Sequence, residues 1–452
     1  MQESLNIQKD FFLKNATRDI NFRVNQLKKL KSQIKVYYDQ ILIAYKKDLN
    51  KSEHTILIDE MFLVMNDLSY MIKKIKQISK PKNMPVGLLN FGAKSKLINE
   101  PCGCVLICCD SMTPILHTFM PIIGAIAGGN TATVLLNFKL KNIIRVIKKI
   151  LDVFEEEYIF VTENQEEIEF FKKQSFDLVF MPNKFKNTEE NFLNEQKLAP
   201  KLIYEESGVN PCIIDEDCDI DYSVKSVVEA KFLNAGLSQN APDYVLVHSN
   251  IKEVWLEKAI DYIKHMYYID GNLCEEYAKS ASKSAVESVL TDVNKNKIVF
   301  GGKFYDGDIL EPTILCDATQ QIYRSEGGLK TPILNVIEFD ELNQELARLK
   351  TQKRPLFLYY FGKDKEKINN ITKSCDFYTC CINGAQSLSL DTKLVVNSLL
   401  SGNTGICRGK QLFYMFTRAK TVIKKEGLLK KELLNQINAK KYIKLFKKAL
   451  GL

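Results

Sequence analysis

Apolar residues recur at helical spacing through residues 1–80 of the chain. The segments FRVNQLKKLKSQI, YYDQILIAYKKDL and MFLVMNDLSYMIKKI place Leu, Ile, Phe and Met three or four positions apart, and no proline precedes Pro81. Such periodicity is typical of helices that bury one stripe. It predicts three helices over residues 10–80.

From about residue 97 the pattern changes to short β-rich runs that alternate with helical ones. Strands are expected at KLINE, CGCVLICC, TATVLL, YIFVT and DLVFM, with helices from Pro114 and over residues 143–151. Between residues 206 and 400, further strands are expected at PCIID, YVLVHS, KIVFGG, PILNVIEF, PLFLYYFG and TCCING. This alternation favours parallel β-α-β units covered on both faces. It predicts a Rossmann-like first half and a second α/β block.

The length of the chain, 452 residues, exceeds the size at which a single core stops growing, so we expect two or three structural units. The longest apolar stretch, residues 112–136, contains Pro114, Pro121 and a Gly-Gly-Asn turn, which favours a helix and a strand over a membrane span. The first residues show no apolar run of signal-peptide length. With twelve cysteines, this predicts a cytoplasmic protein with free thiols and no transmembrane segment.

Four cysteines lie close together in CGCVLICC, namely Cys102, Cys104, Cys108 and Cys109. A zinc site is one interpretation of such a cluster. The other is an apolar strand, which would point neighbouring cysteines to opposite faces. We interpret the segment as a strand and expect no metal.

The formal charge of +8 is concentrated in a C-terminal tail. Residues 421–452 hold nine Lys and two Glu, a net charge of +7, so the preceding 420 residues carry about +1. An apolar stripe recurs between these lysines at helical spacing, which predicts a basic amphipathic helix that docks on its own protein or contacts another protein, RNA or a membrane surface. The stripe comprises Tyr442, Leu445, Phe446, Ala449 and Leu450.

Five segments follow one another in an order known from a single enzyme superfamily. They are INEPCGCVLICCDSMTPILHTFMPIIGAIAGGNTATVLLN, YEESGVNPCIIDEDCDID, KFLNAGLSQNAPDYVLVHSN, EPTIL and INGAQSLSL. Over roughly residues 10–420 the chain resembles the aldehyde dehydrogenase superfamily, and is most similar to its class 3, fatty-aldehyde type. The resemblance implies an α/β fold with a Rossmann-type N-terminal domain, a second α/β domain and oligomerisation strands.

In that family a cysteine thiolate attacks the aldehyde, and hydride passes to NAD(P). The cysteine lies in a run like Phe-x-Asn-x-Gly-Gln-x-Cys-x-Ala-Pro-Asp-Tyr. Here Phe232, Asn234, Gly236 and residues 241–244 match, but Gln239 stands in place of the cysteine. Because a carboxamide is not a nucleophile, the resemblance implies that the covalent route is absent.

Other family positions have changed as well. Met112 replaces the asparagine whose amide helps to stabilise the oxyanion, and Leu135 and Gly328 replace a lysine and a glutamate that contact the cofactor riboses. The glycine-rich turn expected after DLVFM is the glycine-free PNKFKNTEEN, which includes Asn183. From these changes we expect that no cofactor is bound.

Two polar positions of the family are retained. Glu205 aligns with the general base and Asn383 lies in an asparagine-containing loop, and we interpret the retained Glu205 as a carboxylate kept for hydrogen bonding. The four histidines show no paired spacing, and we interpret them as packing or surface residues. They are His54, His117, His248 and His265.

The resemblance divides the chain into five parts. These are residues 1–90, the N-terminal helices; 91–205, a degenerate dinucleotide-binding domain with a hairpin near 90–100; 206–400, a catalytic-type α/β domain; 401–420, an oligomerisation strand; and 421–452, the basic amphipathic helix.

These observations favour a pseudoenzyme that serves as a scaffold or binding protein. The alternative is an NAD- or NADP-dependent aldehyde dehydrogenase with non-standard catalytic residues, which could use a thiol such as Cys212 or Cys407. The resemblance also implies a homodimer or larger homo-oligomer, formed through residues near 90–100 and 408–420, where RGKQLFYMFTRAK shows the alternation of a strand.

Overall fold

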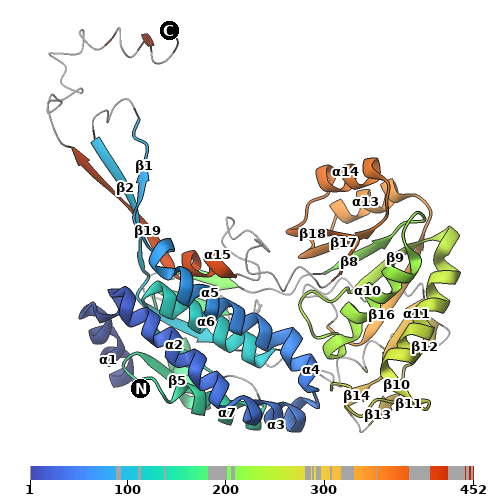
Figure 1. Ribbon diagram of the computed structural model, residues 1–452, viewed down its shortest axis with the longest axis horizontal. Coiled ribbons are helices and arrows are strands. Elements are labelled where there is room, and N and C mark those ends of the chain that lie inside the picture. The colour runs from blue at the N-terminus through green and yellow to red at the C-terminus, as the bar shows by residue number, and fades with distance from the viewer. Residues whose placement is uncertain are drawn as a thin grey trace.

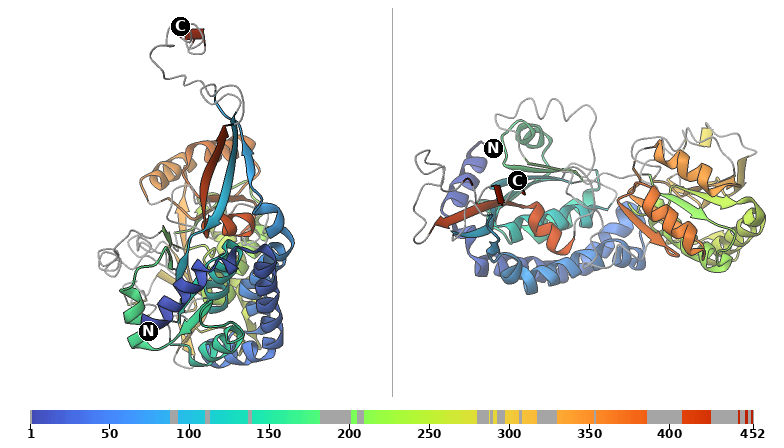
Figure 2. Two further views of the ribbon diagram at one scale, coloured as in Figure 1. Left: turned by 90° about the vertical axis from the view of Figure 1, so that its left-hand side faces the viewer. Right: turned by 90° about the horizontal axis from the view of Figure 1, so that it is seen from above.

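The computed structural model describes most of the chain, and Figure 1 shows two α/β units side by side with a narrow sheet projecting from one of them. The view from above in Figure 2 shows the same separation of the two units. The described residues are 2–87, 93–109, 113–136, 139–181, 201–204, 209–279, 287, 290–291, 297–305, 308–316, 330–352, 354–385, 408–425, 443, 447–448 and 451.

The N-terminal segment is helical, as the periodicity predicts. In the second helix, for example, Leu27, Leu30 and Ile34 form a fully buried stripe, and Asp19 caps its first turn by accepting from two backbone amides. The helical elements are α1 (Gln2–Leu13), η1 (Ala16–Arg18), α2 (Ile20–Val36), α3 (Tyr38–Leu49), α4 (Glu53–Ile56), the π-helical turn η2 (Leu57–Met61) and α5 (Phe62–Ile78).

The first unit contains a five-stranded parallel sheet in the order β5-β4-β3-β6-β7. The chain runs outward from β3 to β5 and then returns to the other side of β3 for β6. The strand order therefore reverses between β3 and β6. The elements are β3 (Cys104–Cys108), α6 (Pro114–Gly128), β4 (Thr131–Leu135), α7 (Lys141–Leu151), β5 (Ile159–Thr162), α8 (Gln165–Lys172), β6 (Leu178–Met181) and β7 (Lys201–Tyr204).

The second unit contains a seven-stranded sheet in the order β12-β15-β16-β9-β8-β17-β18, parallel except for β12. Its main elements are β8 (Pro211–Ile214), α10 (Ile220–Phe232), η4 (Leu233–Gly236), β9 (Tyr244–His248), η5 (Ser249–Ile251), α11 (Lys252–Tyr267), β12 (Ile298–Phe300), β15 (Thr313–Cys316), β16 (Ile333–Phe339), α13 (Leu342–Lys350), β17 (Phe357–Phe361), α14 (Lys365–Ser374) and β18 (Thr379–Ile382). Two small antiparallel pairs join β10 (Tyr268–Ile269) to β11 (Asn272–Leu273) and β13 (Phe304–Tyr305) to β14 (Ile309–Leu310). The two predicted α/β blocks are confirmed.

The projecting sheet is antiparallel and consists of β1 (Lys82–Met84), β2 (Ala93–Pro101) and β19 (Thr417–Lys425) (Figure 1). Strand β19 pairs with β2 along its whole length, from Thr417 opposite Pro101 to Lys425 opposite Ala93. The predicted strand at 408–420 is wrong in its first half, because Gly409–Met415 form helix α15, which buries Leu412 and Phe413 against α6. The predicted helix at 421–452 is wrong at its start, since 421–425 belong to β19; all five residues of its apolar stripe lie outside the described residues.

No helix within the described part of the chain is long and apolar enough to cross a membrane. The stretch at 112–136 contributes α6 and β4, the helix and strand that its prolines and glycines predict.

A buried ion pair links the N-terminal helices to the start of α6. The Lys51 ammonium lies 3.0 Å from Glu60 Oε1, and both side chains are completely buried. Glu60 Oε2 accepts from the Tyr45 hydroxyl at 2.7 Å and from the backbone N–H groups of Ile115 and Leu116 at 2.9 and 3.2 Å. A carboxylate on η2 therefore caps α6, whose own N-cap residue makes no side-chain cap bond.

We expect Lys51→Met to lower the free energy of unfolding by about 3–5 kcal/mol, because it leaves the Glu60 carboxylate buried without its counter-ion. Urea denaturation measures this change, with Lys46→Met, an exposed position near the end of α3, as the control. The double variant Lys51→Met with Glu60→Gln should recover part of the loss. Equal stability of the Lys51 and Lys46 variants would contradict the role of the pair.

Candidate functional site

The loop that carries Gln239 has an unusual backbone. Asn234, Ala235 and Gly236 have φ values of 55°, 49° and 74°, so three consecutive residues occupy the left-handed region. A Cβ at Gly236 would lie 2.1 Å from the carbonyl oxygen of Thr331, so glycine is required there. For the other two residues this conformation costs free energy and persists only where surrounding contacts enforce it.

The enforcing contacts come from Asp59, on η2 of the first unit. Ser238 Oγ donates to Asp59 Oδ1 at 2.7 Å, and Asn234 Nδ2 donates to Oδ2 at 2.5 Å. Burial raises the pKa of the Asp59 carboxyl above its ordinary value, while Lys51 and the two hydrogen bonds act in the opposite direction. The loop is thus fixed by a polar contact between the two units.

Gln239 contacts a histidine on α6. Its side-chain nitrogen Nε2 lies 3.0 Å from Nε2 of His117, and Nδ1 of His117 lies 3.1 Å from the Thr113 hydroxyl. Because an amide nitrogen only donates, His117 Nε2 accepts and the ring proton stands on Nδ1, which donates to Thr113. Gln239 Oε1 accepts no hydrogen bond from any described residue. The two side chains are 6% and 1% exposed, so the pair is held away from bulk solvent.

A second buried cluster lies beneath the same loop. Asn210 Nδ2 donates to the carbonyl oxygens of Gln239 and Ala241 at 2.7 and 2.9 Å, and the Asn210 N–H donates to Asp243 Oδ2 at 2.7 Å. Lys330 forms an ion pair with Asp243 at 3.2 Å.

Lys231 belongs to this cluster but makes no hydrogen bond to the described residues, although its side chain is fully buried. Burial lowers the pKa of the Lys231 ammonium to about 7, with Asp243 opposing the shift and Lys330 adding to it. About half of the Lys231 side chains therefore carry a proton at pH 7.

We expect Lys231→Met to stabilise the fold below pH 7 by an amount on the order of a few kcal/mol, because folding there must bury a charged ammonium. The unfolded chain holds its proton up to a pKa near 10.5 and the folded chain only to about 7, so the wild type gains stability as the pH rises between these values. The advantage of the variant should shrink over this interval. Chemical denaturation at several pH values measures it, with the exposed Lys225→Met as the control; a difference independent of pH would refute the buried ammonium.

The residues predicted from the sequence are only partly brought together. Leu135 ends β4 and is fully buried, and Asn383 follows β18, where its side chain pairs with the backbone of Gly362. Gln239 precedes β9, at the amino edge of the same parallel sheet whose carboxyl edge holds Asn383, so these two residues do not share a site. Four predicted positions lie outside the described residues, namely Met112, Asn183, Glu205 and Gly328.

The thiols suggested as substitute nucleophiles find little support. Cys212 lies within β8, is fully buried, and burial raises the pKa of its thiol well above the ordinary value. A thiol in that state supplies no thiolate near neutral pH. Cys407 lies outside the described residues.

His117 is the site residue that the sequence interpretation missed. The sequence gives it only the interpretation of a packing or surface residue, because no second histidine stands at a paired spacing. Its position in the sequence could have identified it, because it stands three residues after Pro114 in the segment that also holds the altered Met112. Its partner Gln239 is 122 positions away, so no local spacing rule would have joined them.

The carboxyl edge of the five-stranded sheet has the topology of a nucleotide site. Ligands of open parallel sheets bind outside the carboxyl ends of strands at the point where strand order reverses, here between β3 and β6. The described residues at these ends are apolar or thiol-bearing: Cys109 and Met181 are 4% and 7% exposed. The backbone framework therefore fits a dinucleotide, while Leu135 offers it no polar group.

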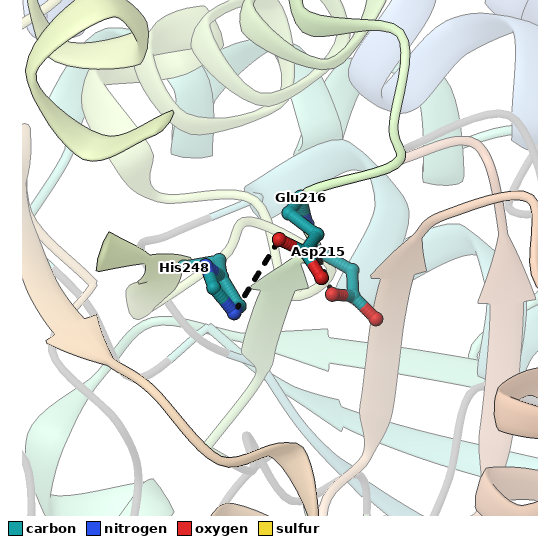
Figure 3. Close-up of side chains that lie close together, drawn as sticks. All are labelled: Asp215, Glu216 and His248. Atoms are coloured by element: carbon teal, nitrogen blue, oxygen red, sulfur yellow. Dashed lines mark hydrogen bonds and ion pairs between the residues drawn. The ribbon is translucent and has the colours of Figure 1, made fainter. Parts of the chain in front are cut away.

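Figure 3 shows a separate cluster at the carboxyl edge of the seven-stranded sheet, formed by Asp215, Glu216 and His248. Its donor set does not fit a metal ion. His248 Nδ1 accepts from the Asn250 N–H at 3.2 Å, so the ring proton stands on Nε2, which points toward Glu216 at 4.0 Å and has no lone pair for a metal. Both oxygens of Asp215 are engaged, by Lys367 at 3.0 Å and by the Tyr360 hydroxyl at 2.7 Å.

Comparison with known proteins identifies the family. Residues 8–422 match the model of the aldehyde dehydrogenase family. The chain belongs to this family. A 4,4'-diaponeurosporen-aldehyde dehydrogenase of Staphylococcus aureus is 30% identical over 97% of each chain, and aldehyde dehydrogenase family 3 member A2 of rat is 24% identical over 97% of this chain and 90% of its own.

The fold agrees with solved structures of the family. A substrate-bound Staphylococcus aureus AldH superposes with a TM-score of 0.89 at 30% identity, covering 98% of this chain and 99% of that one. The sequence prediction of an aldehyde dehydrogenase fold related to class 3 is therefore confirmed. Membership of an enzyme family supports the oxidoreductase interpretation better than the scaffold interpretation.

The expectation that no cofactor is bound is contradicted by related structures. GapN of Methanocaldococcus jannaschii, which is complexed with NADP, has a TM-score of 0.80 at 17% identity over 94% of each chain. A betaine aldehyde dehydrogenase of Staphylococcus aureus in complex with NAD+ has a TM-score of 0.75 at 18% identity, covering 96% of this chain and 88% of that one. Single side chains at the ribose positions do not decide binding, because the reversal of strand order that creates the nucleotide crevice is intact.

Proposed function

We propose that this protein is an NAD- or NADP-dependent aldehyde oxidoreductase that works without a cysteine nucleophile. In the overall reaction an aldehyde, water and the oxidised nicotinamide give a carboxylic acid, the reduced nicotinamide and a proton. The nicotinamide, when bound, supplies the two-electron acceptor. It would lie at the carboxyl ends of β3 and β6.

The observation that carries this proposal is the strained loop at Asn234, Ala235 and Gly236. Left-handed backbone at non-glycine residues costs on the order of 1–3 kcal/mol per residue and clusters at functional sites. Here it serves to place Gln239 against His117, and two hydrogen bonds to a buried carboxylate maintain it. A surface scaffold gains nothing from such an arrangement inside the molecule.

The shape of the first unit supports an apolar aldehyde as the substrate. A groove of about 710 Å³ lies between α2, α3, η2 and α5, and its lining is almost entirely apolar. Leu57 and Met61, which line it, stand on the same π-helical turn as Asp59. The 30% identical relative is named for 4,4'-diaponeurosporen-aldehyde, and we propose an aldehyde with a long apolar chain here too.

We expect the purified protein to form reduced nicotinamide when it is given a long-chain aldehyde and NAD or NADP, and less with a short polar aldehyde. Gln239→Leu should lower the rate at least about tenfold, because it removes the polar group that faces His117. Cys212→Ser and Cys407→Ser are the matched controls and should retain the rate, since the proposal needs no thiol.

The competing function is a binding protein, which is favoured by the carboxamide at position 239. If the wild type forms no reduced nicotinamide while Gln239→Cys does, the protein binds aldehydes without oxidising them and the proposal fails. Loss of activity in Cys407→Ser alone would instead show that a thiol from outside the described residues acts as nucleophile.

We also propose a homodimer or larger homo-oligomer, formed through the projecting sheet. Val422 and Ile423 of β19 are 46% and 50% exposed, and large apolar side chains on an outlying strand favour contact with another copy.

The chain mass is 51.8 kDa, and sedimentation at micromolar concentration should give at least twice this value. Replacing Val422 and Ile423 together by Lys should shift the protein toward the monomer, because charges would be buried at the contact. Val254→Lys, at an equally exposed position on α11, is the control and should leave the mass unchanged. A wild-type mass near that of one chain would refute the assembly.

A further inference from the structure

The side-chain oxygen of Gln239 is a buried acceptor with an imposed direction. Gln239 Nε2 lies 3.0 Å from His117 Nε2, and because an amide nitrogen only donates, it donates to that ring nitrogen. The amide therefore turns its N–H toward His117 and its oxygen Oε1 away from it. Oε1 accepts no hydrogen bond from the described residues, and the side chain is 94% buried, being 6% exposed.

An unsatisfied buried acceptor of this kind lowers the stability of the fold, and a ligand that donates to it recovers that loss. An aldehyde carbonyl cannot do so, because its oxygen only accepts. The hydrate of the aldehyde can: water adds its oxygen to the carbonyl carbon, one proton moves to the former carbonyl oxygen, and the product carries two hydroxyl donors on a tetrahedral carbon.

We propose that the site binds its aldehyde as the hydrate, with one hydroxyl donating to Gln239 Oε1, and that His117 positions Gln239 for this contact. The inference rests on the proposed function, since it takes an aldehyde as the substrate. Binding of the hydrate explains why a glutamine can stand at position 239. The hydrate already has the tetrahedral carbon that the family obtains by adding a thiolate, so no nucleophile is needed there. His117 acts through Gln239 and is a positioning residue.

The test uses a long-chain alkyl trifluoromethyl ketone, which is hydrated in water, and follows its fluorine resonance on binding to the full-length protein without nicotinamide. We expect the bound ligand to be the hydrate. Gln239→Met, of similar volume but without an acceptor, should weaken binding at least about tenfold. The matching alkyl methyl ketone, which stays unhydrated, should bind equally to wild type and Gln239→Met.

Two further variants separate positioning from folding. His117→Leu should weaken hydrate binding with little change in melting temperature, and His117→Gln should restore it, because a glutamine oxygen can accept from the Gln239 N–H. Gln239→Cys should replace the hydrate resonance by that of a covalent thiol adduct. If the wild type binds the unhydrated ketone, or if Gln239→Met binds the hydrate as tightly as wild type, the inference is overturned.

These outcomes are distinct from those that bear on the proposed function. Hydrate binding without any formation of reduced nicotinamide from aldehydes would refute the oxidoreductase and support the assignment of the ligand. Formation of reduced nicotinamide together with binding of the unhydrated ketone would refute the hydrate and leave the oxidoreductase standing.

Discussion

Two adjacent buried carboxylates, Asp59 and Glu60, hold the candidate site together. Asp59 accepts from Asn234 and Ser238 on the loop of the second unit, and Glu60 accepts from the first backbone amides of α6 in the first unit. Neighbouring residues on a helix point in different directions, and one turn can therefore reach both. The turn is π-helical, a form that occurs mostly as single turns, frequently at functional sites. The contact between Gln239 and His117 depends on both anchors.

The partners of Asp59 and Glu60 explain how two adjacent carboxylates can be buried inside the protein. Two carboxylates side by side in an apolar interior would repel one another and favour protonation. Lys51 compensates Glu60 directly, and five further donors, two backbone amides and three side chains, also bind the two carboxylates. The polar network therefore makes the site depend on correct docking of the two units, because Asn234 and Ser238 reach Asp59 only in that geometry.

Periodicity alone predicts most of the fold. The alternation of short apolar runs and helical segments identifies β3 to β6 and β8, β9, β16, β17 and β18, because a buried parallel strand is apolar throughout. It fails at Gly409–Met415, where the segment RGKQLFYMFTRAK reads as a strand but its aromatic residues pack as one face of a short helix against α6. Tertiary packing decides between helix and strand in so short a segment.

Part of the candidate site can be predicted from the sequence, and part of it cannot. The register of the run from Phe232 to Tyr244 identifies Gln239 directly, since seven matching positions leave no freedom. The contact with His117 and the anchor at Asp59 are long-range, and each joins positions more than a hundred residues apart. For the cofactor, the altered side chains at the ribose positions predict that none binds. The crevice itself is formed by the strand order, which is a property of the whole sheet and not of single positions.

The strained backbone at Asn234 and Ala235 indicates that the side chain at position 239 still has a role. If the cysteine had been lost with all function, nothing would oppose relaxation of Asn234 and Ala235 from the left-handed region, or replacement of Asp59 by an apolar residue that avoids burying a carboxylate. Both costly features are present together, and both serve to place the side chain at position 239. Glutamine there makes a directed hydrogen bond to His117 and leaves a buried, oriented acceptor on its other side. A site that maintains such an acceptor at a cost in stability is organised for a ligand that donates to it.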